Sequence, residues 1–135
     1  MPNILYAKIG PIHHGIIHRF PEDKGGTKES FPYLANNHVH MLEFNFWIEQ
    51  HHNERDIEYL EADRIIRKDI VFLFGGADYY NQENTRTWSC ETIATNLYKK
   101  LIQNEVFKGR SIRISVLEDG RNGAYAEFYE NRKAS

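Results

Sequence analysis

The chain has 135 residues and a mass of 15.9 kDa, and its content of 41% hydrophobic and 27% charged residues suits one domain over residues 1–135. Lysine and arginine total 17 against 19 aspartate and glutamate, and the net charge of −2 predicts no nucleic acid and no membrane surface as a partner. No apolar run reaches the roughly 18–20 residues of a membrane helix, the N-terminus does not resemble a signal peptide, and a single cysteine, Cys90, is typical of a cytoplasmic protein.

The first predicted elements are two strands joined by a long loop. Residues 4–19 are rich in β-branched and aromatic side chains broken by glycine and proline, which predicts a strand with a bulge or turn. Residues 21–37 contain the proline, glycine, serine and asparagine typical of a loop. Residues 38–49 follow a two-residue period that predicts a second strand. One face of that strand carries two histidines and then apolar side chains: His38, His40, Leu42, Phe44, Phe46 and Ile48.

Two helices are predicted next. From Leu60 the apolar residues recur at helical spacing until Phe74-Gly75-Gly76 ends the helix. A polar loop over roughly 75–87 leads to Ser89, which is a plausible N-cap. The helix after it is expected to extend to about Asn104.

The C-terminal part predicts a hairpin. Residues 111–118 alternate as a strand, and Asp119-Gly120 together with Asn122-Gly123 marks a turn. Residues 124–130 are expected to form the closing strand. The order β-β-α-α-β-β predicts an α+β domain with antiparallel hairpins at both ends.

Seven histidines are the chain's most distinctive chemical feature. His38 and His40 are two residues apart on a predicted strand, so both imidazoles face the same side and can bind one metal ion, with His18 at the end of the first strand as a candidate third ligand. Chance, or hydrogen bonding between strands, is the alternative explanation of the pair, and the spacing alone favours it over a metal site. The pairs His13-His14 and His51-His52 would point to opposite faces of a strand, which makes a shared site less favoured.

Four segments in register resemble the family of 6-pyruvoyltetrahydropterin and 6-carboxytetrahydropterin synthases. They are Ile16-Ile17-His18-Arg19-Phe20, His38-Val39-His40, Ser89-Cys90-Glu91-Thr92-Ile93-Ala94 and Val116-Leu117-Glu118-Asp119. They are similar to the family's His-Arg after the first strand, its His-Gly-His, its Thr-x-Glu helix start and its Glu-Thr late in the third strand. Leu60-Glu61-Ala62-Asp63 also resembles the entry to the family's first helix.

This resemblance implies the tunnelling fold, in which subunits join their sheets into a barrel. It further implies a homo-oligomer, in the form of a hexamer, with active sites between subunits. It implies Zn2+ held by His18, His38 and His40, and a pterin-like small-molecule substrate anchored by Glu118. Glu91 either takes part in substrate binding or compensates the helix dipole.

The chain departs from the family pattern at the proton-transfer groups. The family's cysteine base falls at Pro32, and the loop between the helices has no Asp-His dyad, which leaves Asp78 and Tyr79 as weak catalytic candidates. Cys90 is a third weak candidate, although a buried small hydrophobe is the more natural interpretation. Three functions therefore stay open: a zinc-dependent pterin lyase or synthase, a relative with a different ring substrate, and a non-catalytic zinc- or pterin-binding module.

Overall fold

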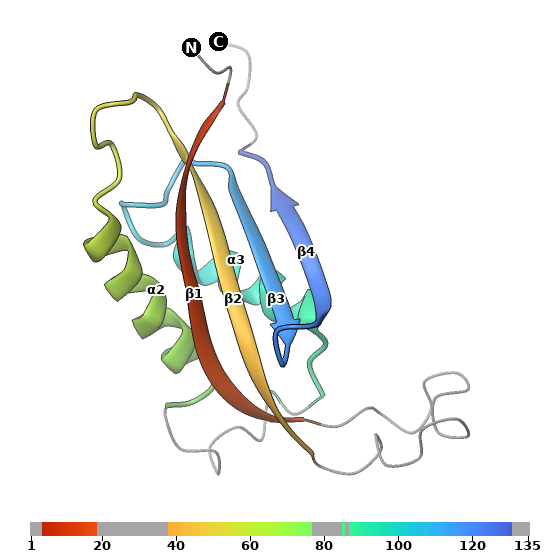
Figure 1. Ribbon diagram of the computed structural model, residues 1–135. Coiled ribbons are helices and arrows are strands. Elements are labelled where there is room, and N and C mark those ends of the chain that lie inside the picture. Colours follow the sequence, from red (N-terminus) through yellow and green to blue (C-terminus); the bar gives the residue numbers. More distant parts are fainter. Residues whose placement is uncertain (1–3, 19–37, 77–84, 86, 131–135) are drawn as a thin grey trace.

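The computed structural model describes residues 4–18, 38–76, 85 and 87–130 (Figure 1). The elements of the chain, in order, are β1 (Leu5–His18), β2 (His38–Gln50), α2 (Tyr59–Leu73), α3 (Cys90–Leu101), β3 (Ile112–Glu118) and β4 (Asn122–Phe128). This is an α+β arrangement of one four-stranded antiparallel sheet and two helices, as the sequence pattern predicts.

The strands are neighbours in chain order, β1-β2-β3-β4, and every pair is antiparallel. The register of β1 with β2 shifts between Ile9 and Ile12, which is the predicted bulge. Gly10 lies in this bulge with a φ of 120°, and a Cβ there would meet the carbonyl oxygen of Phe44 at 2.7 Å. Glycine is therefore required where β1 bends across β2.

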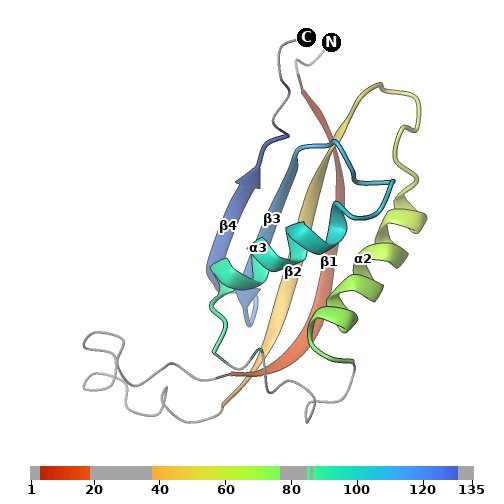
Figure 2. The same cartoon turned by 180° about the vertical axis from the view of Figure 1, so that it is seen from behind.

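Both helices pack on the same face of the sheet (Figure 2). The side chains that β2 turns toward them are fully buried: Leu42, Phe44, Phe46 and Ile48. The apolar faces of the helices pack on this side of the sheet, where Ile66 and Ile70 of α2 and Ile93 and Leu97 of α3 are buried. The apolar residues that follow the strand period and those that follow the helix period therefore form one core.

The opposite face of the sheet carries aromatic and charged side chains and is not covered by any element that the structure describes. Trp47 and Tyr125 meet edge to face with ring centroids 6.0 Å apart, and the guanidinium of Arg113 lies 4.3 Å from the ring centroid of Tyr6. We call these four residues the aromatic face. Of the four, Tyr125 is exposed, at 54%, and the others are partly buried.

Several predicted boundaries need correction. Asn122-Gly123 opens β4 and is not part of the turn, and β4 ends at Phe128 rather than at residue 130. A Cβ at residue 123 would meet the carbonyl oxygen of Val116 at 1.9 Å, so this glycine serves strand packing and not a bend. Helix α3 ends at Leu101, three residues before the predicted end.

No helix among the described residues is long and apolar enough to cross a membrane. The predicted loop over residues 21–37, with Pro32, lies outside the described residues, as do Asp78 and Tyr79.

Candidate functional site

One end of the sheet brings together the segments that the sequence singled out. Here β1 ends, β2 begins, β3 ends, and the helical layer passes from the end of α2 to the start of α3 (Figure 1). In the register of the sheet His18 is opposite His38, and Leu42 is opposite Glu118. Residues directly opposite in antiparallel strands face the same side. These backbone positions therefore share the helix-covered face.

His38 and His40 lie side by side on β2. Their imidazole rings meet edge to face with centroids 4.8 Å apart, and both residues are partly buried. They continue the inward row that Leu42 begins, so they stand at the open end of the core rather than on the aromatic face. The predicted same-face pair is thus present in the structure.

Two carboxylates at the end of β3 lie beside His40. Its Nε2 lies 3.5 Å from Oε2 of Glu118, and its Nδ1 lies 2.7 Å from Oδ2 of Asp119. Hydrogen bonds from the backbone N–H of Met41 and from His40 hold the pKa of Asp119 below its usual value, so this carboxylate is ionised at neutral pH. The sequence analysis identified Glu118 but missed Asp119, whose only signal was its place directly after that residue.

Cys90 begins α3 and faces Glu118. Its Sγ lies 3.9 Å from Oε1 of that carboxylate, and the residue is only 7% exposed. Burial, followed by the charges of Glu118 and Glu91, raises the pKa of the Cys90 thiol to about 12. The thiol is therefore protonated at neutral pH and is a poor nucleophile, in agreement with its interpretation as a small buried hydrophobe.

Glu91 lies in the first turn of α3 and is exposed. A carboxylate at this place favours the helix N-terminus, where Ser89 caps the chain by accepting a hydrogen bond from the N–H of Thr92. Both roles considered for Glu91 remain compatible with this position.

The two histidine pairs have different surroundings. His14 is half-buried on the helix-covered face, where its ring stacks on Phe74 with centroids 5.2 Å apart, and burial lowers its pKa. Within the described part of the chain its Nε2 is buried without a hydrogen-bond partner. His51 and His52 are exposed after β2, and the ring of His52 lies 3.4 Å from Asp56. Sequence spacing predicts that His13 and His14 face opposite sides of a strand, but it does not predict which of them is buried, because that depends on the end of α2.

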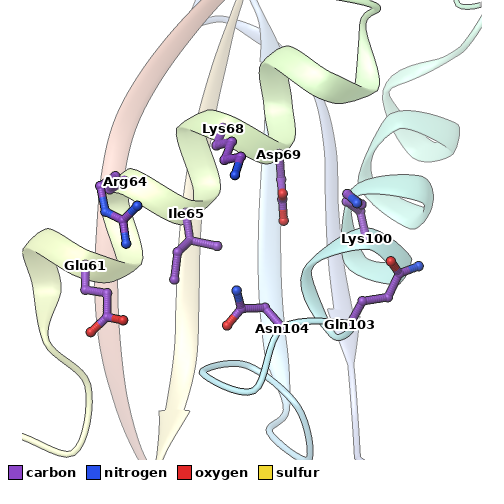
Figure 3. A pocket seen from close by; sticks show the side chains of 8 residues that line it. All are labelled: Glu61, Arg64, Ile65, Lys68, Asp69, Lys100, Gln103 and Asn104. Carbon is purple, nitrogen blue, oxygen red and sulfur yellow. The ribbon is translucent and has the colours of Figure 1, made fainter.

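A polar cavity of about 510 Å³ lies elsewhere, between the two helices (Figure 3). Its lining comes from α2 and from the end of α3 and the residues after it: Glu61, Arg64, Ile65, Lys68, Asp69, Lys100, Gln103 and Asn104. Cys90 begins α3 while Lys100 lies near its end, so this cavity is at the other end of α3 from the histidines. It contributes none of the residues predicted for the site.

The histidine end has a donor set that suits zinc, because zinc binds neutral imidazole nitrogens. Two imidazoles are in contact there, and a third histidine occupies the opposed backbone position. No group of three or more His, Cys, Asp or Glu residues that could hold a metal ion is found among the described residues, which do not include the side chain of His18.

No family model matches this chain, and no curated protein or solved structure matches it either.

Proposed function

We propose that this chain is a zinc-dependent pterin-processing protein, a lyase or synthase similar to 6-pyruvoyltetrahydropterin or 6-carboxytetrahydropterin synthase. The observation that carries the proposal is the 3.5 Å approach of Glu118 to the Nε2 atom of His40, at the end of the sheet where His18 and His38 are opposed. The imidazole that we propose as a metal ligand and the carboxylate that we propose as the ring anchor are adjacent on one face.

The metal ligands in this proposal are His18, His38 and His40. Three protein ligands with one open position are typical of catalytic zinc, which when bound polarises a substrate oxygen and makes neighbouring C–H bonds more acidic. The helix-covered face restricts water at this end of the sheet, since Leu42 directly behind the pair is fully buried.

Glu118 is the proposed anchor for the ring. An ionised carboxylate offers two acceptors to the two donors on the edge of a pterin. The side chain of Glu118 is 31% exposed, so it is partly shielded and still accessible to a ligand. A ring without those donors would leave the carboxylate poorly paired, which favours pterins over simple aromatic rings.

A second candidate is a zinc- and pterin-binding module without turnover. The raised pKa of Cys90 favours it, because a thiol with a pKa of about 12 does not replace the cysteine base that Pro32 removes. Asp78 and Tyr79 remain the candidates for proton transfer in the catalytic version. A relative with a different ring substrate is the third possibility, and the same binding experiment separates it from the other two.

Homo-oligomer formation, as a hexamer, belongs to the same proposal. Its support is the aromatic face together with β1 and β4, each of which has one neighbouring strand among the described residues. Open edges and exposed aromatic area favour association with further copies. Light scattering that returns a stable monomer at micromolar concentration would contradict it.

Calorimetric titration of the zinc-loaded protein with biopterin tests the binding function. We expect wild-type binding, and a loss of roughly 2–4 kcal/mol in Glu118→Gln, which is typical of a charge-assisted contact. Glu127→Gln is the matched control, because this carboxylate lies on the exposed side of β4 beside Arg113. Equal affinities of wild type and Glu118→Gln would remove Glu118 from the site, and no binding to wild type would favour a different ring substrate.

A further inference from the structure

Asp119 is the first residue after β3, and its carboxylate contacts β2 with both oxygens. Oδ2 lies 2.7 Å from Nδ1 of His40, and Oδ1 accepts a hydrogen bond of 2.9 Å from the backbone N–H of Met41. Because an ionised carboxylate only accepts, the hydrogen on the His40 ring that points toward Asp119 is on Nδ1. The contact with Met41 anchors the carboxylate on β2, and the contact with His40 favours the ring tautomer that carries its hydrogen on Nδ1.

The backbone holds Asp119 in this position. Its N–H donates to the carbonyl of Met41 at 2.7 Å, and its φ of 54° lies in the left-handed region that aspartate tolerates better than most residues. The residue that begins the β3–β4 turn thus also places its carboxylate against β2.

We propose that Asp119 is a positioning residue, which holds the His40 ring with Nδ1–H toward the β3–β4 turn and so leaves Nε2 as the ring nitrogen that can bind a divalent cation. The inference rests on the zinc site proposed above. Histidine ligands of metals commonly donate their other ring N–H to a carboxylate, which sets the tautomer and raises the basicity of the binding nitrogen. Loss of such a partner typically weakens metal binding by roughly 10- to 100-fold.

Zinc affinity, measured by competition with a chromophoric chelator, is the first test. Asp119→Gly removes the carboxylate while glycine suits the positive φ, and Asp119→Asn keeps the shape but cannot accept in both contacts. We expect both variants to bind zinc roughly 10- to 100-fold more weakly than wild type. Glu127→Gln, which removes an exposed carboxylate beside Arg113 on β4, is the control and should match wild type.

The ring tautomer of His40 in the metal-free protein is the second test, read from nitrogen-15 NMR at mildly alkaline pH. We expect the Nδ1–H form in wild type and a shift toward the Nε2–H form in Asp119→Gly. Equal zinc affinity in wild type and both Asp119 variants, or an unchanged tautomer, would overturn the role of Asp119. A wild-type protein that binds no zinc would overturn the proposed metal site itself, which the tautomer does not measure, so the two failures are distinguishable.

Discussion

Cys90 should be among the least reactive cysteines that a small protein can carry, and the structure sets the scale of this effect. Burial and the charges of Glu118 and Glu91 raise its pKa from 9.0 to about 12. At about pH 7.5 the thiolate fraction then falls from roughly 3% to roughly 0.003%, about a thousandfold. Since the thiolate is the reactive form, alkylation should be much slower than in the unfolded chain, although the greater nucleophilicity of a more basic thiolate offsets part of this factor.

The assay is iodoacetamide alkylation followed by intact-mass spectrometry, on metal-free protein, in buffer and in urea. Glu118→Gln removes the nearer of the two charges that raise the pKa, so this variant should react faster than wild type in buffer, while Glu127→Gln should not. A native wild-type rate within tenfold of the unfolded rate would refute the assignment of Cys90 as a protonated thiol. Equal native rates in Glu118→Gln and wild type would refute the coupling to Glu118.

Three further predictions concern the described fold. Asp56 forms a two-pronged ion pair with Arg110, with side chains 10% and 13% exposed, so Asp56→Asn should lower the free energy of unfolding by about 2–3 kcal/mol in urea titrations. This pair holds the Asp56 pKa well below its usual 3.8, so the contribution of the pair to the free energy of unfolding should be complete above pH 3.8 and should decline as the pH falls below it. A stability difference between wild type and Asp56→Asn that does not shrink in acid would contradict the assignment. Gly123→Ala should cost about 3 kcal/mol, because its Cβ would overlap the carbonyl of Val116, and an unchanged melting temperature would refute this packing. Burial lowers the His14 pKa from 6.5, so NMR should show the ring more than half neutral at pH 6.5, and stability should fall as the solution becomes more acidic. Titration of His14 at its ordinary pKa would contradict its burial.

The strands and helices could be predicted because each leaves a local period in the sequence. The alternation from His38 to Ile48 predicted which face of β2 is buried, and the apolar spacing after Leu60 predicted α2. Errors occurred where one residue type has two uses. Gly123 reads as a turn glycine, but the close approach of β3 requires it within β4.

The site was predictable only in part, because contacts between distant segments depend on register. That His38 and His40 share a face follows from spacing alone. The contact of His40 with Asp119 requires the pairing of β2 with β3 and a left-handed turn residue, which local patterns do not specify. The meeting of Cys90 with Glu118 likewise depends on where α3 crosses the sheet.

Turnover of dihydroneopterin triphosphate tests the proposed function most directly. The zinc-loaded protein is incubated with this substrate, and release of inorganic triphosphate is followed by chromatography beside a His38→Ala, His40→Ala double variant. Zinc-dependent pterin processing predicts multiple turnovers by wild type, stoichiometric zinc in wild type, and loss of both in the double variant. Stoichiometric zinc that persists in the double variant would show that the metal is bound elsewhere, and a wild-type protein that binds zinc and biopterin but releases no triphosphate would contradict a synthase of the 6-pyruvoyltetrahydropterin type.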